Sequence, residues 1–226
     1  MQQMEEFIPL VIELKKKIEI IENQNTELKQ KVKILEEKIE NISKIMEQNQ
    51  EKQMKQTPCN KLFKSNIIDD NDEKVIMNWI PNKINSTELI FDTARDGDSI
   101  KAFEERCKGQ SPTLVIVKTT IGIIFGGYAT SDWKEKGPIE DYNSFVFSLN
   151  PQKKYNVTYP QNALYGYRYN DIMFQFGCCC FRIAPNCTKN NDSYINEGYY
   201  EKGLIDLIKG DHKFKVNRLE IFRVNF

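Results

Sequence analysis

The apolar residues between Met4 and Met46 recur at alternating intervals of three and four residues. This spacing is a heptad repeat, and it predicts one long α-helix with an apolar stripe along one face. β-branched residues dominate the a positions and leucine the d positions, which favours a parallel two-stranded coiled coil, although two isoleucines at d leave a trimer open. The predicted seam consists of Val11, Leu14, Ile18, Ile21, Asn25, Leu28, Val32, Leu35, Ile39 and Ile42.

A single polar residue, Asn25, stands in this seam. A lone asparagine at an a position can bond its symmetry mate only when two strands are parallel and in register. Oppositely charged residues on the flanks, Lys17 with Glu22 and Lys31 with Glu36, would attract each other across the same parallel pair. We therefore expect a parallel homodimer. The alternative is a long single helix that packs on its own chain.

The helical pattern stops at Thr57-Pro58, because the residue before a proline disfavours the α conformation. The polar stretch that follows reads as a linker, and after it the apolar period changes from helical to strand-like. The sequence thus predicts a coiled-coil helix over 1–57, a linker over 58–71 and a β-rich domain over 72–226.

The second half of the chain alternates short apolar runs with turn residues. Two helices are expected, Asp72–Ile80 and Asp98–Lys108, the latter with Asp98 as N-cap and Gly109 at its end. Many short strands beside two helices are typical of an antiparallel two-sheet β-sandwich with edge helices, so the expected class is α+β, mainly β. The expected strands are Leu89–Thr93, Leu114–Thr119, Ile123–Tyr128, Ser144–Leu149, Ile172–Phe176, Cys179–Ile183 and Arg218–Val224.

Charge and histidine content argue against several functional classes. The 32 basic residues balance the 32 acidic ones, so the chain has no basic excess for nucleic acid. His212 is the only histidine, which removes the usual general base and multi-histidine metal sites. No apolar run reaches membrane-spanning length, and no signal peptide is recognisable. We expect a cytoplasmic, non-enzymatic protein with protein partners and without metal, cofactor or direct membrane insertion.

The six cysteines include the run Cys178, Cys179 and Cys180. Without an oxidising compartment these residues stay thiols. In a strand, Cys178 and Cys180 would point to one face and Cys179 to the other. Peroxide sensing needs a thiol of lowered pKa, for which Arg182 is the cation nearest in sequence, and simple burial in the core is the alternative.

Three further features can be read as structural or as functional. Arg95-Asp96-Gly97 reads first as a turn with a cap rather than a binding corner. Phe125-Gly126-Gly127 lacks the following helix that a phosphate-binding loop requires. Glu220 lies between apolar residues of a strand, and it is either a buried functional carboxylate or the polar face of an edge strand.

From about residue 71 to residue 226, short motifs occur in an order that resembles the TLDc domain family. They include an Arg-Asp-Gly-x-Ser corner, a Pro-Thr-Leu strand start, a Phe-Gly-Gly-Tyr run followed by a tryptophan, a Ser-Phe-Val-Phe-Ser-Leu strand, a central Phe-Gly and a closing strand around a glutamate. The motif positions are Arg95, Asp96, Gly97, Ser99, Phe125, Gly126, Gly127, Trp133, Gly177 and Glu220.

The resemblance implies a two-sheet β-sandwich and a role in oxidative-stress resistance. Some members of the family bind the vacuolar proton-pumping ATPase, and no enzymatic mechanism is common to the family. Two departures are the cysteine run 178–180, where a glycine-rich stretch is frequent, and Phe222 in place of a closing tryptophan. The implied function is a non-enzymatic adaptor or regulator. The alternatives are a thiol-based peroxide sensor or antioxidant at Cys178–Cys180 and a purely structural coiled-coil scaffold.

Overall fold

The structure is a computed structural model of the 226-residue chain, and it divides into two compact units, Met1–Asn60 and Lys61–Phe226. None of the helices in the described part combines the length and the hydropathy that a membrane span needs. The structure describes residues 13, 15–17, 21–41, 61–134, 137–166, 172–178, 180–208, 210 and 212–226.

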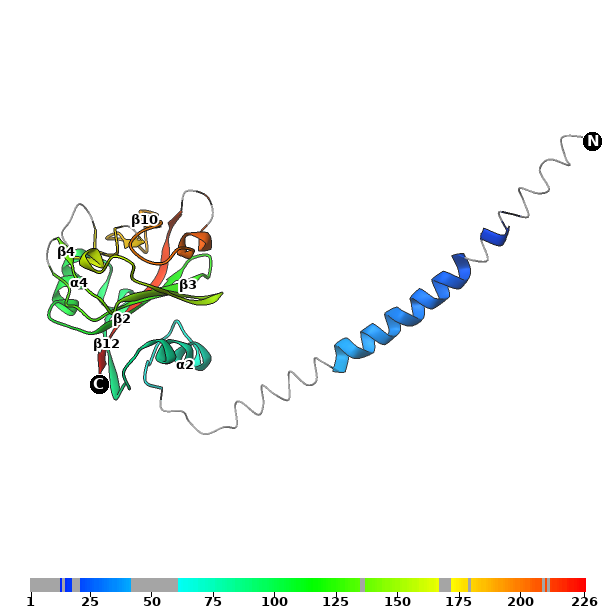
Figure 1. Cartoon of the computed structure of the whole chain (residues 1–226), viewed down its shortest axis with the longest axis horizontal. Helices are drawn as coiled ribbons and strands as arrows, with labels where there is room; N and C mark the ends of the chain where they lie inside the picture. Colours follow the sequence, from blue (N-terminus) through cyan, green and yellow to red (C-terminus); the bar gives the residue numbers. More distant parts are fainter. Residues whose placement is uncertain are drawn as a thin grey trace, which may run out of the picture. The chain divides into compact units, whose positions relative to one another are not determined.

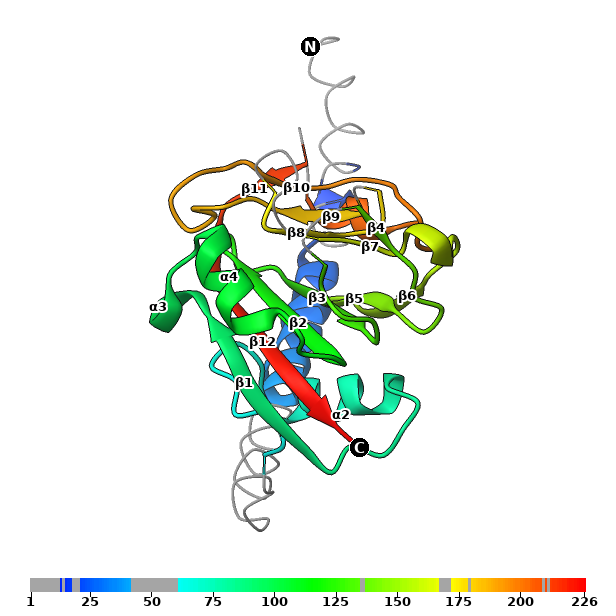
Figure 2. The ribbon, with the colours of Figure 1, turned by 90° about the vertical axis from the view of Figure 1, so that its left-hand side faces the viewer.

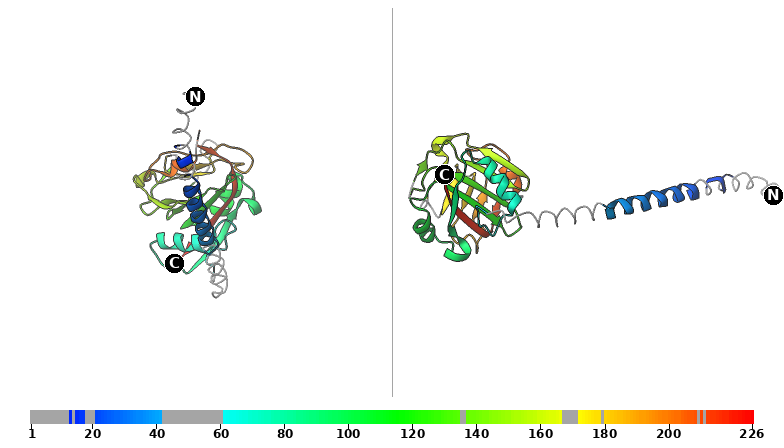
Figure 3. Two further views of the ribbon diagram at one scale, coloured as in Figure 1. Left: turned by 90° about the vertical axis from the view of Figure 1, so that its right-hand side faces the viewer. Right: turned by 90° about the horizontal axis from the view of Figure 1, so that it is seen from below.

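In the first unit, residues 21–41 form one continuous α-helix (Figure 3). This confirms the helix over these residues, and every side chain along it is exposed. The stripe residues Ile21, Leu28, Val32, Leu35 and Ile39 are between 49% and 64% exposed in the single chain. The seam positions that lie outside the described residues are Val11, Leu14, Ile18 and Ile42.

The second unit is built on two antiparallel six-stranded sheets, as expected (Figure 1). The first sheet has the order β1 (Ser86–Asp92), β12 (Val216–Asn225), β2 (Thr113–Thr119), β3 (Ile124–Ala129), β5 (Phe145–Leu149) and β6 (Gln152–Asn156). The second has the order β11 (Lys213–Phe214), β10 (Ser193–Ile195), β9 (Phe181–Ile183), β8 (Phe174–Phe176), β7 (Leu164–Tyr165) and β4 (Pro138–Ile139). The 3₁₀ turn η1 (Pro160–Asn162) lies between β6 of the first sheet and β7 of the second, and η2 (Leu204–Leu207) lies between β10 and β11 of the second sheet.

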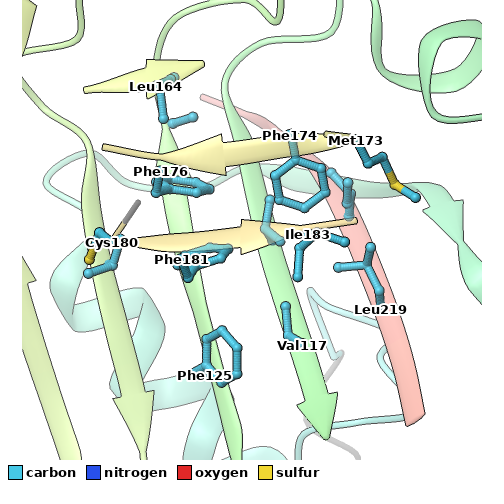
Figure 4. Packing of buried hydrophobic residues seen from close by; sticks show 14 of the residues in the cluster. Val117, Phe125, Leu164, Met173, Phe174, Phe176, Cys180, Phe181, Ile183 and Leu219 are labelled. Carbon is cyan, nitrogen blue, oxygen red and sulfur yellow. The ribbon is translucent and has the colours of Figure 1, made fainter. Parts of the chain in front are cut away.

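The main core lies between the two sheets (Figure 4). Phe125 of β3 and Phe181 of β9 meet edge to face, with ring centroids 5.3 Å apart. Phe176 of β8 stacks on Phe181 at 4.7 Å. Because successive strand residues point to opposite faces, the alternate apolar residues of both sheets turn inward and fill this layer.

A second core covers the outer face of the first sheet. Figure 1 shows α2 (Asp70–Trp79) on one side of this sheet and β10 on the other. The segment 61–69, which leads into α2, contributes the buried Phe63, Ile67 and Ile68. The predicted linker 58–71 is therefore wrong for these residues, because their apolar side chains pack on the sheet and make the segment part of the domain.

Two short helices, α3 (Thr93–Asp96) and α4 (Ile100–Cys107), contact the edge strand β1 (Figure 2). The helix expected over Asp98–Lys108 is confirmed, with the bounds Ile100–Cys107. Its N-cap is Ser99, whose Oγ accepts the amide hydrogen of Ala102 at 3.1 Å. Asp98 is not the cap, because its carboxylate points away and binds Thr188 of the second sheet's 184–192 loop.

Candidate functional site

The Arg95-Asp96-Gly97 corner satisfies the backbone of a β-bulge. The register of β1 against β12 shifts between Leu89 and Phe91, which leaves Ile90 without an opposite residue in β12. The Arg95 guanidinium donates to the backbone carbonyl oxygen of Ile90 at 3.0 Å and to the Asp96 carboxylate at 2.7 Å. This pairing gives the corner a structural role.

The carboxylate of Asp96 is held in its charged form. Partial burial alone would raise its pKa, but hydrogen bonds from Arg95 and from the Asp92 amide, and the nearby Arg106, bring the pKa below its ordinary value. Gly97 follows with φ of +79°, a conformation that glycine adopts without strain. The corner thus reverses the chain from β1 into α4.

The glycines of the Phe125-Gly126-Gly127 run allow close packing on both faces of β3. A Cβ on Gly126 would overlap the carbonyl oxygen of Val115 and lie 2.6 Å from the Phe147 ring. A Cβ on Gly127 would lie 2.5 Å from the Phe176 ring, on the opposite face. Neither glycine lies in a loop, so the run is a packing motif rather than an anion site.

Trp133 and Gly177 also serve the core. The Trp133 ring is buried among Phe103, Phe174 and Phe176, and its indole N–H donates to Thr113 Oγ1 at 3.1 Å. Gly177 has φ of +62° and begins the tight turn between β8 and β9.

Glu220 is fully buried on β12, which is an inner strand of its sheet. Ser65 Oγ donates to its carboxylate at 2.5 Å and the Asn66 amide at 3.1 Å, while Arg218 Nε lies 3.1 Å away. Arg218 also pairs with Asp92 at 2.6 Å. Of the two alternatives for Glu220, the polar face of an edge strand is therefore wrong, and the buried carboxylate holds the 61–69 segment on the sheet.

The hydroxyl group of Ser65 makes hydrogen bonds within the domain. It donates to Glu220 and accepts the amide hydrogens of Ile67 and Ile68 at 3.0 and 3.3 Å.

The ring of His212 bonds the carbonyl oxygen of Ile208 through Nδ1 at 2.8 Å. Within the described residues, His, Cys, Asp and Glu side chains form no cluster of three that could hold a metal ion.

Neither Cys178 nor Cys180 lies in a strand. The last residue of β8, Phe176, pairs with the first residue of β9, Phe181, and between them Cys178 is exposed while Cys180 is buried. The expectation that these two thiols share a face is therefore wrong, because the positive φ of Gly177 ends the strand first. Cys179 lies outside the described residues.

Burial raises the pKa of the Cys180 thiol from its ordinary value of 9.0 to about 12. A thiol with this pKa is almost wholly protonated at neutral pH, and the thiolate is the form that attacks peroxides. Cys187, another buried cysteine, has its pKa raised to about 12, mainly by burial and also by Asp98. These pKa values make Cys180 and Cys187 poor peroxide-reactive thiols.

The raised pKa of Cys180 predicts loss of stability in alkali. Between the ordinary value of 9.0 and about 12, the unfolded chain releases a proton that the folded chain retains. The free energy of unfolding therefore falls as the pH rises through this window and is unaffected below it. Urea unfolding from pH 8 to 11 should show a smaller fall for Cys180→Ala than for the wild type. Equal slopes for the two proteins would contradict the assignment.

The sequence of residues 61–225 matches the model of the TLDc domain family. Similar curated proteins include TBC1 domain family member 24 of Xenopus tropicalis, 30% identical over 99 residues, which are 40% of this chain and 18% of that protein. MTOR-associated protein MEAK7 of Danio rerio is 27% identical over 157 residues, which are 60% of this chain and 32% of that protein. GTPase-activating protein skywalker of Drosophila melanogaster is 29% identical over 90 residues, which are 34% of this chain and 15% of that protein.

The chain thus spans 32% or less of the length of each of these three relatives. The matched region coincides with the unit Lys61–Phe226, in which the motif residues hold the bulge, the sheet faces and the lead-in segment in place. Because the family model covers well over half of the chain, the protein belongs to the TLDc domain family.

Proposed function

We propose that the protein is a cytoplasmic, non-enzymatic adaptor or regulator, in which a parallel coiled-coil dimer presents two TLDc domains to a protein partner. The observation that carries the proposal is the use of the motif side chains. Arg95, Asp96 and Glu220 are bound to groups of their own domain, and Gly126 and Gly127 have packed neighbours. A domain whose characteristic residues maintain the fold acts through its outer surface.

The family resemblance suggests the vacuolar proton-pumping ATPase as the partner and oxidative-stress resistance as the context. The names of the relatives add association with MTOR and GTPase activation, both properties of much longer proteins. A dimer suits a target with repeated subunits, because linking two binding domains raises apparent affinity by roughly 10² or more when both can engage.

Two other functions make different predictions. Of the two described cysteines of the run, Cys178 is the one that suits a peroxide sensor, because Cys178 is exposed whereas burial disfavours the thiolate of Cys180. A purely structural scaffold would depend on the helix alone. Affinity purification from native lysate with three baits separates these functions: the intact chain, a chain lacking residues 1–56 and Cys178→Ser.

Enrichment of peripheral ATPase subunits by all three baits would support the adaptor and assign binding to the TLDc domain. Enrichment that requires residues 1–56 would assign binding to the helix. If neither the intact chain nor its Cys178→Ser variant enriches any ATPase subunit, the ATPase proposal is wrong. Loss with Cys178→Ser alone would favour the thiol function.

The coiled-coil dimer can be tested with two neighbouring residues. Leu35 occupies a d position of the heptad, whereas Ile34 occupies the outward-facing c position. Their exposed fractions in the single chain are nearly equal, 57% and 53%, so the single helix gives no reason for different effects. A dimer buries only Leu35, which stabilises association by about 2 kcal/mol per side chain.

We expect Leu35→Asp to reduce the molar mass of the full chain, measured by light scattering, from dimer to monomer. Ile34→Asp should leave the dimer mass unchanged. Equal behaviour of the two variants, or a monomeric wild type, would argue against the predicted seam. A trimeric mass in the wild type would retain the seam but change the number of strands.

A further inference from the structure

Three connecting segments of the TLDc domain come together on one surface. They are 138–144 before β5, 156–162 after β6 and 196–202 after β10. The amide of Asp141 donates to the carbonyl oxygen of Pro160 at 2.9 Å. The amide of Thr158 donates to the carbonyl oxygen of Tyr199 at 2.8 Å. Figure 2 shows β4, β6 and β7 meeting at this side of the domain.

Buried polar groups fix the three segments below the surface. The hydroxyl group of Tyr200 donates to the carbonyl oxygen of Ala163 at 2.8 Å and lies 2.9 Å from Ser144 Oγ. The Asp141 carboxylate accepts hydrogen bonds from Thr130 N and Oγ1, both at 2.6 Å. A surface built on such a network is preorganised, so a partner has little ordering entropy to overcome.

This surface carries tyrosine rings. Tyr142 and Tyr159 are 63% and 48% exposed, and they are two of the four most exposed large apolar side chains described in residues 61–226. Tyr142 follows Asp141 and Tyr159 precedes Pro160, so the two tyrosines are the neighbours of the backbone hydrogen bond that joins Asp141 to Pro160. The ring of Tyr159 lies 4.9 Å from that of Tyr199. Exposed, rigid tyrosines are typical of the energetic centres of protein interfaces.

The same segments are acidic. They contain Glu140, Asp141, Glu197 and Glu201 but only one base, Lys202, which pairs with Glu197 at 3.3 Å. Across the described residues, neither Glu140 nor Glu201 forms an ion pair with a lysine or arginine. Glu140 instead accepts a hydrogen bond from the Tyr142 hydroxyl group at 2.7 Å.

Carboxylates beside aromatic faces complement a cationic side chain in two ways. The carboxylate pairs with the charge, and the negative face of the ring attracts the same cation. Arginine fits best, because its planar guanidinium group stacks on a ring while it bonds an oxygen. The negative charge of the surface repels nucleic acid and anionic lipid, which leaves a basic protein segment as the matching occupant.

We propose that Tyr142, Tyr159 and Tyr199, together with Glu140 and Glu201, form a docking surface for an arginine-bearing segment of the partner protein. This tyrosine–acid surface deepens the adaptor function, since it names the chemistry of the partner, and it rests on that function. Its affinity falls with rising ionic strength, because the paired charges are exposed.

The test titrates the full chain with a fluorescent synthetic peptide in which arginines are spaced by glycine and serine. We expect saturable binding that Tyr159→Ala weakens by about tenfold or more, whereas Tyr159→Phe, which keeps the ring, binds as the wild type. Ile121→Ala is the matched control, since Ile121 is 71% exposed on the β2–β3 hairpin and lies outside the three segments.

An otherwise identical peptide with glutamate in place of arginine should not bind. Absence of arginine-peptide binding by the wild type, or equal binding by Tyr159→Ala and the wild type, would overturn the proposal. A lower molar mass of Tyr159→Ala by light scattering would assign the surface to a second copy of the chain and would also overturn it.

The peptide titration is independent of the lysate experiment. If the intact chain captures ATPase subunits but the variants do not differ in peptide binding, the adaptor function is retained and the tyrosine–acid surface is rejected. Tyrosine-dependent peptide binding without ATPase capture retains the surface and rejects that partner.

Discussion

A chain that begins at residue 72 is expected to remain unfolded, whereas one that begins at Lys61 should unfold cooperatively in urea. The two chains differ by residues 61–71, of which Phe63, Ile67 and Ile68 are buried against the first sheet. Burial of each of these side chains stabilises the domain by about 2 kcal/mol. The shorter chain lacks these contacts.

The shorter chain also leaves Glu220 without its hydrogen bonds from Ser65 and Asn66. A hydrogen bond to a charged group stabilises a protein by about 1.5–3 kcal/mol, and only Arg218, 3.1 Å from the carboxylate, remains as a partner in the shorter chain. Together the losses are comparable to the whole stability of a small domain, roughly 5–15 kcal/mol. Far-ultraviolet circular dichroism during urea titration measures the difference.

A matched pair of full-chain variants separates packing from chain length. Phe63 is 1% exposed and meets the Phe222 ring edge to face at 5.4 Å, so Phe63→Ala should lower the free energy of unfolding by about 3–5 kcal/mol. Its neighbour Lys64 is exposed, and Lys64→Ala should change that energy by less than about 0.5 kcal/mol. Similar small effects for both would show that the segment does not pack on the sheet.

Gly126→Ala and Gly127→Ala are each expected to destabilise the domain by about 3 kcal/mol, because the added methyl group has no space. The two variants should differ in whether a second change can rescue them. The obstacle at Gly127 is the ring of Phe176, a side chain that can be made smaller. The obstacle at Gly126 includes the backbone carbonyl of Val115 in the neighbouring strand, which no substitution removes.

Double-mutant cycles measure this difference. Phe176→Leu should recover about 1 kcal/mol or more when combined with Gly127→Ala, whereas Phe147→Leu should recover little when combined with Gly126→Ala. Equal coupling energies in the two cycles would contradict the assignment of a side-chain obstacle on one face and a backbone obstacle on the other.

Features with a local physical cause were predictable from the sequence. The heptad spacing indicates the helix over the described residues 21–41, since side chains three and four residues apart share a face. The hairpin at Gly122, where φ is +86°, follows from the need of its turn for a residue without Cβ. The apolar strands β2, β3, β5 and β12 were recognisable because they alternate or run continuously through a buried layer.

Other elements were missed because their local signal is weak or misleading. Strand β6 carries two lysines and one buried side chain, Tyr155, as suits the edge of a sheet. Strands β4, β7 and β11 have two residues each and depend on their partners for definition. The cysteine run was assigned to a strand because the turn between β8 and β9 has no proline or asparagine to mark it.

The tyrosines of the proposed docking surface were also missed. Tyr142, Tyr159 and Tyr199 belong to three segments that are well separated in sequence, and no spacing rule connects them. The segments come together because Asp141 binds Thr130 and Pro160, Tyr200 binds Ala163, and Thr158 binds Tyr199. A signal was nevertheless present in two of the segments, 138–144 and 196–202, since each combines tyrosine with carboxylates, whereas 156–162 has a tyrosine and no acid.

The sequence by itself determined the helix over residues 21–41, the mainly β class of the second unit and the order of the family motifs, because periodicity and chain conformation act between near neighbours. Tertiary structure alone decided that the 61–69 segment belongs to the domain and that Glu220 is buried on an inner strand. Those outcomes depend on the partner that each side chain meets across more than a hundred residues, and burial by a distant segment leaves no local pattern.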